Sequence, residues 1–199
     1  VYSMHQQNRR DKYLREILAR GIRVGVVAGS DSHRLPIGSL CPDPDRMWLQ
    51  PDVIDGQTGS QSIQKKCGIQ ATFAKKVTRQ SLWNAMLRRH TYGTTGARII
   101  LLLTVNNVEM GGSLTMKPGQ PPVIAAHIGG TAALQEITLF RYQEKQWTTP
   151  YVETDKETAL HDFRFTDTTA QAPAIYYLRV RQTDGEIAWS SPIWLTPAT

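Results

Sequence analysis

The sequence contains few cysteines and no long apolar run. Its two cysteines, Cys41 and Cys67, are too few for a disulfide framework, and no Cys-x-x-Cys spacing predicts a structural zinc site. Whether these two residues pair stays open. No segment approaches the roughly 18 apolar residues that span a bilayer, and no signal-peptide pattern is present. We therefore expect neither a disulfide-stapled miniprotein nor a membrane partner.

A long basic block is also missing. Lysine and arginine outnumber aspartate and glutamate by 23 to 17, which gives a net charge of +6, but these residues are scattered. No basic motif interleaved with aromatic residues is present, so we expect no nucleic-acid partner. A solvated basic face explains this balance, and a mild preference for anionic ligands is compatible with it.

A short apolar run is the clearest signal in the first half of the chain. Residues Ile22–Ala28 are rich in β-branched side chains and lie between Gly21 and Gly29, which is typical of a buried strand. A helix over residues 8–20 precedes this run, and an expected strand tail at residues 1–4 precedes the helix. Strand, helix and strand with short links predict a βαβ unit with a parallel pair.

A carboxylate and an imidazole follow this predicted strand. Asp31 and His33 lie two residues apart, so extended backbone places both on one side, and this pair of ligands suits zinc, manganese or iron. His5 lies at the end of the expected first strand and is a candidate third ligand or substrate contact. Alternatively, Asp31 caps a turn and His33 faces solvent. Two ligands alone are too few for a tight site.

The remainder of the first half combines a loop, a helix and a turn. Residues 34–70 are rich in proline and glycine and have the features of a site-covering loop or of a surface insertion. Thr78 is expected to cap a helix over residues 79–90, whose buried face is predicted to comprise Leu82, Trp83, Met86 and Leu87. Thr95 lies in a glycine-flanked turn that could hold an anion, with Arg98 directly after it, although a plain connector is the simpler explanation.

From Ile99 onward the pattern changes to short alternating strands separated by turn residues. An Asp184-Gly185 turn between two such strands predicts a hairpin. This spacing indicates an antiparallel β-sandwich, so we expect an α/β domain at residues 1–98 and a β-sandwich at residues 99–199. The strands are expected at 99–105, 123–128, 134–142, 175–180 and 187–195.

Residues 21–33, which contain Asp31-Ser32-His33, resemble the last metal-ligand motif of the PHP-domain metal-dependent hydrolases. Within that family the chain is most similar to the carbaryl-hydrolase-type branch, in which a helix and a Tyr-x-Thr-Thr-Gly-x-Arg-Ile segment follow the motif. Matching segments lie at residues 1–5, 81–89, 92–99, 176–180 and 189–194.

This resemblance implies a fold and an activity. It implies the C-terminal part of a (β/α)7 barrel followed by the β-sandwich, with Asp31 and His33 binding divalent zinc, manganese or iron. The implied reaction is metal-assisted hydrolysis of a small-molecule phosphoester or other ester-like substrate, with Arg98 as a phosphate or oxyanion contact. The family's N-terminal His-x-His motif is absent. The chain is therefore expected to be a fragment with a partial site, which a missing N-terminal part of the same protein completes.

Two other functions remain open from the sequence. The β-sandwich could be a binding module for carbohydrate or protein, attached to an inactive α/β remnant. Exposed Trp147, Trp189 and Trp194 on one sheet face would favour that function, and buried ones would not. Alternatively, the fragment has no activity and self-associates to cover unpaired sheet edges. The sequence does not indicate a compartment.

Overall fold

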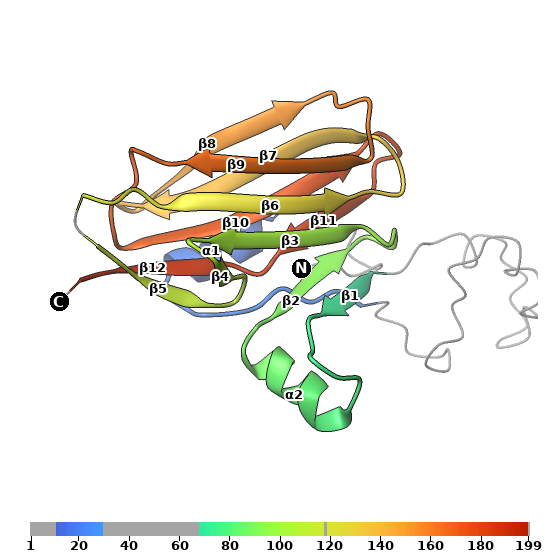
Figure 1. Ribbon diagram of the computed structural model, residues 1–199, viewed down its shortest axis with the longest axis horizontal. Helices are drawn as coiled ribbons and strands as arrows, with labels where there is room; N and C mark the ends of the chain where they lie inside the picture. The colour runs from blue at the N-terminus through green and yellow to red at the C-terminus, as the bar shows by residue number, and fades with distance from the viewer. Residues whose placement is uncertain (1–10, 30–67, 118, 199) are drawn as a thin grey trace, which may run out of the picture.

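The computed structural model describes residues 11–29, 68–117 and 119–198, and within these ranges the chain is built mainly of β-strands (Figure 1). Two short helices are present there, α1 (Lys12–Ala19) and α2 (Arg79–Leu87). The strands are β1 (Ile69–Thr72), β2 (Thr91–Thr94), β3 (Ile100–Val105), β4 (Val108–Glu109), β5 (Ser113–Met116), β6 (Val123–Gly129), β7 (Leu134–Gln143), β8 (Gln146–Thr154), β9 (Leu160–Thr166), β10 (Ala174–Gln182), β11 (Ile187–Ser190) and β12 (Ile193–Pro197).

The strands form two sheets. The large sheet has eight strands in the order β1-β2-β11-β10-β12-β5, with β7 paired to β10 and β8 paired to β7. The small sheet has four strands in the order β4-β3-β6-β9. Every pairing is antiparallel except that of β12 with β5. Strands β1 and β2, which precede residue 98, therefore share a sheet with strands from the end of the chain.

The predicted fold class was wrong. The expectation of a (β/α)7 barrel segment requires parallel strands that alternate with helices, and the described part of the chain contains no such arrangement. Its first-half strands, β1 and β2, pair antiparallel with each other, and β2 then pairs antiparallel with β11. The physical reason is that β1 and β2 are joined as a hairpin-like pair through α2, so the chain reverses direction instead of crossing over.

The inner face of the large sheet packs against the small sheet. Twenty-one buried residues form this inner core, with contributions from both sheets, and Leu101, Ile128, Leu139 and Leu178 are fully buried within it. Alternation explains how β3 contributes. Leu101 and Leu103 point inward and are buried, whereas Ile100 and Leu102, which alternate with them along the strand, are exposed. Apolar side chains from two facing sheets thus provide the main stabilisation.

The outer face of the large sheet is covered by α1 and by residues 22–29 (Figure 1). Leu14 and Leu18 of α1 pack there against a second, smaller group of buried residues. The members of this outer core are Leu14, Leu18, Val26, Phe140, Tyr177, Ile187, Trp189 and Trp194. Tyr13 and Ile17, the other large apolar residues of α1, are exposed, so α1 buries only Leu14 and Leu18 against the sheet.

Several local predictions were confirmed. The strands expected after residue 98 correspond to β3, β6, β7, β10, β11 and β12. The expected hairpin joins β10 and β11, with Arg181 opposite Ile187 and Gly185 at a positive φ of 82° in the turn. Thr78 caps α2, because its hydroxyl accepts a hydrogen bond from the Ser81 N–H at 3.2 Å.

The predicted buried face of α2 was wrong. Ala85 is the buried residue of this helix, and Leu82 is half-buried. Trp83, Met86 and Leu87 are exposed, because α2 projects from the β1–β2 pair away from both sheets (Figure 1). Neither helix in the described ranges is long and apolar enough to span a bilayer.

Candidate functional site

The chain that leads to Asp31 and His33 is anchored on the outer face of the large sheet. The backbone N–H of Val26 donates to Ser191 Oγ at 2.8 Å, and Thr91 Oγ1 donates to the carbonyl of Val26 at 2.8 Å. Val26 is fully buried. Hydroxyl groups from β2 and from the β11–β12 link therefore satisfy both backbone polar groups of this residue.

Two glycines let the same segment approach the sheet closely. A Cβ atom at Gly93 of β2 would lie 3.0 Å from the Cβ of Ala28, and one at Gly68 would lie 2.9 Å from the backbone nitrogen of Gly29. Only glycine permits such contacts without displacement of the neighbouring chain. Gly29, the last described residue before Asp31, is therefore held at the beginning of β1.

The prediction that Ile22–Ala28 forms a buried strand of a βαβ unit was wrong. Within this run only Ala28 has an isolated β-bridge, and only Val26 is buried. The segment crosses the face of the large sheet at Gly93 instead of extending its edge. At its buried residue, Val26, the backbone is bound by the hydroxyls of Thr91 and Ser191 instead of by a neighbouring strand.

The predicted metal ligands Asp31 and His33, and the candidate contact His5, lie outside the described residues, as do Cys41 and Cys67. Among the residues that the structure does describe, no group of three or more histidine, cysteine, aspartate or glutamate side chains could hold a metal ion. These side chains therefore do not form a complete metal centre by themselves.

The turn that contains Thr95 already holds an anion, the carboxylate of Glu186. Thr95 Oγ1 donates to Glu186 Oε2 at 2.6 Å, and the backbone N–H of Ala97 donates to the same oxygen at 3.3 Å. Thr95 Oγ1 also accepts from the N–H of Ile187 at 2.9 Å. Thr95 and Glu186 are both buried. The geometry expected for a bound anion is present, and a side chain of the protein occupies it.

Arg98 lies directly after this turn and is exposed. No hydrogen bond or ion pair links its guanidinium to another residue in the described ranges. Its neighbour Ile99 is buried and begins the path into β3. Arg98 therefore presents its charge to solvent, where it is accessible to an anionic group.

Asp11, at the start of α1, forms a buried cluster that we call the outer clamp, with Tyr177 and Arg179 of β10. The Tyr177 hydroxyl donates to Asp11, and Arg179 Nη1 lies 3.4 Å from Asp11 Oδ1. Burial and the negative charge of Asp11 raise the pKa of Tyr177 above its ordinary value. The ring of Phe140 stacks on Tyr177 with centroids 4.7 Å apart and lies beneath Arg179. The outer clamp fixes α1 to the sheet.

A second buried cluster, the inner clamp, comprises Asp167, Tyr176, Arg141 and Thr169. Tyr176 donates to Asp167 Oδ2 at 2.8 Å, and Arg141 Nη1 donates to the same oxygen at 2.7 Å. Burial opposes ionisation of Asp167, but hydrogen bonds from Tyr176 and Thr169 and the charge of Arg141 outweigh it, so the pKa of Asp167 is lowered. This cluster ties the end of β9 to the large sheet.

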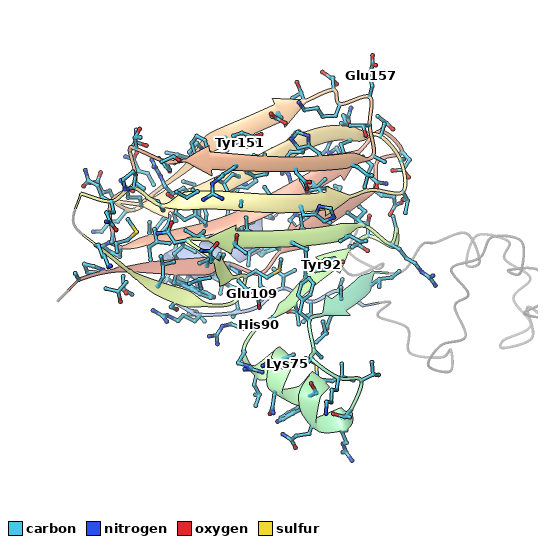
Figure 2. The ribbon with its side chains drawn as sticks, in the orientation of Figure 1. Lys75, His90, Tyr92, Glu109, Tyr151 and Glu157 are labelled. Atoms are coloured by element: carbon cyan, nitrogen blue, oxygen red, sulfur yellow. The ribbon has the colours of Figure 1, made fainter. Side chains whose placement is uncertain are left out.

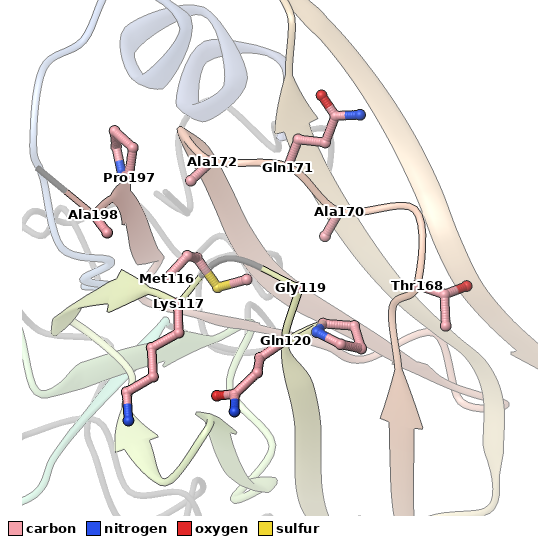
Figure 3. A pocket seen from close by; sticks show the side chains of 11 residues that line it. Met116, Lys117, Gly119, Gln120, Thr168, Ala170, Gln171, Ala172, Pro197 and Ala198 are labelled. Carbon is pink, nitrogen blue, oxygen red and sulfur yellow. The ribbon is translucent and has the colours of Figure 1, made fainter.

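A surface hollow of about 540 Å³ lies beside the inner clamp (Figure 3). The polar side chains of its lining are Lys117, Gln120, Thr168 and Gln171, and the rest of the lining is small or apolar. Its described lining includes no histidine, cysteine or carboxylate. The described lining therefore offers hydrogen-bonding groups and the positive charge of Lys117.

Pairs of histidine and carboxylate were missed by the sequence analysis. His127 of β6 lies opposite Asp162 of β9, with Nδ1 and Oδ1 2.5 Å apart, and His161 Nε2 lies 2.6 Å from Glu153 Oε2. His90 and Glu109 approach to 3.6 Å (Figure 2). The partners are separated by long stretches of sequence or depend on strand register, so no local spacing predicts them. None of these pairs belongs to a larger group of ligating side chains within the described chain.

The family model for a protein of unknown function, DUF3604, matches residues 4–109, which is more than half of the chain. The chain belongs to this family. The match includes Asp31 and His33, both helices and strands β1 to β4, whereas the later strands lie beyond it.

Relatives of this DUF3604 chain occur in chlamydiae. An uncharacterised protein of Chlamydia pneumoniae is 34% identical over 191 residues, and one of Chlamydia trachomatis serovar D is 34% identical over 189 residues. The alignments cover 90% and 89% of this chain but only 28% of each relative. The chain thus spans less than a third of the length of the curated relatives that it matches.

One solved structure, of an engineered protein, gives a match that covers 49% of this chain and 20% of its own. The sequence identity is 12% and the TM-score is 0.32, so this similarity carries no argument about fold or function.

Proposed function

We propose that this chain supplies two ligands, Asp31 and His33, to the metal site of a divalent-metal-dependent hydrolase. The proposed substrates are small phosphoesters or other ester-like molecules. The supporting observation is that the Asp-x-His motif begins two residues after Gly29, which is anchored against the sheet.

Firm attachment is what a metal ligand requires. A ligating side chain must be held within about half an ångström of its working position, and packed backbone achieves this better than a free loop does. The two 2.8 Å hydrogen bonds at Val26 and the close contacts at Gly68 and Gly93 provide such an attachment. The segment that leads to Asp31 is thus fixed at its beginning.

The remaining ligands must come from elsewhere. A catalytic zinc ion usually has three protein ligands, and this motif offers two, with His5 as a further candidate. Most of the length of the chlamydial relatives lies outside the region that matches this chain. We place the missing ligands in that additional length. Arg98, exposed and without an ion-pair partner in the described chain, is the proposed contact for an anionic substrate group.

A carbohydrate- or protein-binding module is not favoured. Trp189 is fully buried and Trp194 is 5% exposed, and both belong to the outer core beneath α1 and residues 22–29. Trp147 packs against the same core. These side chains stabilise the outer face and do not form an exposed aromatic surface.

The test is the metal content of a longer family protein that carries this chain, measured for the unchanged sequence and for D31A and H33A. We expect each substitution to lower bound zinc, manganese or iron at least tenfold and to abolish hydrolysis of p-nitrophenyl phosphate. Asp155, which is exposed directly after β8 and has a positive φ of 54° that asparagine tolerates, gives the control D155N with unchanged metal content. Equal metal content in D31A and the unchanged protein would overturn the assignment.

A further inference from the structure

Helix α2 exposes an apolar surface that no described residue covers. We call Trp83, Met86 and Leu87 of the helix, together with Val77 directly before its cap, the α2 stripe; the exposed fractions of residues 77, 83, 86 and 87 are 94%, 56%, 42% and 60%. Positions 83, 86 and 87 share one side of the helix, because residues three and four apart are neighbours on a helical surface. A helix normally turns its apolar side toward a partner.

The surroundings of the α2 stripe are strongly basic. From Gly56 to Val108 the sequence has eight lysine and arginine residues and no aspartate or glutamate, and the carboxylate that follows, Glu109, lies 3.6 Å from His90. Lys75 lies beside α2 in Figure 2, and exposed Lys76, Arg79 and Arg88 also flank the helix. A partner for this surface must therefore offer an apolar centre with an acidic rim.

Exposed apolar side chains are concentrated in one part of the chain. Of the twelve large apolar residues found exposed in the described ranges, eight precede residue 91. The same part lies within the family match at residues 4–109. Four of the eight form the α2 stripe, and the other four lie on α1 and in residues 22–27. Scattered exposed apolar residues are normal, but several within one short stretch such as the α2 stripe are typical of an interaction surface.

We propose that the α2 stripe is the docking surface for the rest of a longer family polypeptide. The occupant is an apolar patch with an acidic rim. It lies in the part of the longer polypeptide that corresponds to the region of the chlamydial relatives outside the 28% that aligns with this chain. A second copy of this chain is disfavoured as the occupant, because two such surfaces would bring uncompensated positive charges together. This proposal does not depend on the hydrolase assignment.

The test compares this chain alone with a chimera in which it replaces the matching part of the Chlamydia pneumoniae relative. Both proteins are exposed to hydroxyl radicals, and oxidation of Trp83 and Met86 is measured by mass spectrometry. We expect at least fivefold protection of both residues in the monomeric chimera. Leu160 of β9, which is 66% exposed, serves as the reference and should oxidise equally in both proteins.

Charge reversal tests the acidic rim. In the chimera, K75E combined with K76E should restore oxidation of Trp83 to the level of the isolated chain. R164E, at an exposed position on β9, is the matched control and should leave the protection intact. Protection that is unaffected by K75E and K76E would overturn the acidic character of the partner.

Three results would overturn the proposal as a whole. The first is equal oxidation of Trp83 in the isolated chain and in a chimera that melts cooperatively. The others are protection of Trp83 that appears only when the chimera dimerises, and binding of the chimera to phosphatidylserine vesicles that depends on Trp83. If the chimera does not fold, the intact Chlamydia pneumoniae protein is used with a photo-crosslinking amino acid at the position aligned with Trp83. Cross-links to peptides outside the matched region would support the proposal. Their absence would overturn it.

Discussion

The two faces of strand β10 use the same chemistry for different purposes. Tyr176 and Tyr177 are consecutive, so they point to opposite faces of the large sheet, and each donates its hydroxyl to a buried aspartate that also contacts an arginine. On the inner face Asp167 ties one sheet to the other. On the outer face Asp11 ties a helix to the sheet.

The difference lies in what surrounds each clamp. The inner clamp adjoins a core of twenty-one buried residues, whereas the outer clamp adjoins one of eight. Loss of the inner clamp should therefore lower the stability of both sheets, which unfold together as one cooperative unit. Loss of the outer clamp should release α1 and the anchored segment that leads to Asp31 while the sheets persist.

The largest effect is expected for Asp167→Ala. This change leaves Arg141, whose side chain is 10% exposed, without its carboxylate partner, and such a loss typically costs about 3–5 kcal/mol. We expect the free energy of unfolding in urea to fall by that amount, with one transition shared by circular dichroism and fluorescence. A second transition that involves α1 alone would contradict the assignment of this clamp to the main core.

Acidity provides a second test of the inner clamp. The pKa of Asp167 is lowered in the folded state, so ionised Asp167 stabilises the fold at every pH above the ordinary carboxyl pKa of about 4. This contribution is lost as the pH falls through the lowered pKa of the folded protein. The stability difference between the unchanged chain and Asp167→Asn should be largest near neutral pH and should shrink below pH 4. A difference that stays constant between pH 7 and pH 3 would contradict this account.

A smaller and local effect is expected for Asp11→Ala. The Tyr177 hydroxyl loses its buried acceptor, which costs about 2–3 kcal/mol, whereas Arg179 keeps Glu136 at 2.6 Å. Hydrogen exchange should accelerate in α1 and at Val26 but not in β6 or β9. Tyr177→Phe in the Asp11→Ala background should add little, because both changes remove the same hydrogen bond.

The parts of this structure that sequence could predict depend on local pattern. Alternation identified β3, and the Asp-Gly turn identified the β10–β11 hairpin. The run Ile22–Ala28 misled because its composition is that of a buried strand, although the backbone of its buried residue, Val26, is bound by the hydroxyls of Thr91 and Ser191. Those partners lie 65 and 165 residues away in the chain.

The candidate site shows the same limit. The turn at Thr95 was identified as one that could bind an anion, but its anion is Glu186, 91 residues away. Both clamps also join residues that are distant in sequence, and Asp11 lies 166 residues from Tyr177. Spacing alone cannot identify such contacts, because it reports only which residues share a strand or helix face.

Gly93→Ala tests whether the anchored segment needs close contact with the sheet. The new Cβ would lie 3.0 Å from that of Ala28, and the resulting displacement should cost about 1–2 kcal/mol. Exchange of the Val26 amide, protected by Ser191, should accelerate. Gly29→Ala is the control, since a Cβ there meets no atom of the described residues within 4 Å. Equal exchange rates at Val26 in both variants would contradict the anchoring described above.

The smallest effect is expected at the histidine pair on the small sheet. His127 and Asp162 have side chains that are 49% and 75% exposed, so His127→Gln should change the free energy of unfolding by less than about 1 kcal/mol. His161→Gln should lower the free energy of unfolding by more, because the His161 side chain is only 16% exposed. His161 of β9 contacts Glu153 of β8, where the open edges of the two sheets meet. Urea denaturation of the two variants at pH 6 and pH 8 measures the difference. An equal loss of stability in both would mean that exposure does not govern the strength of these pairs.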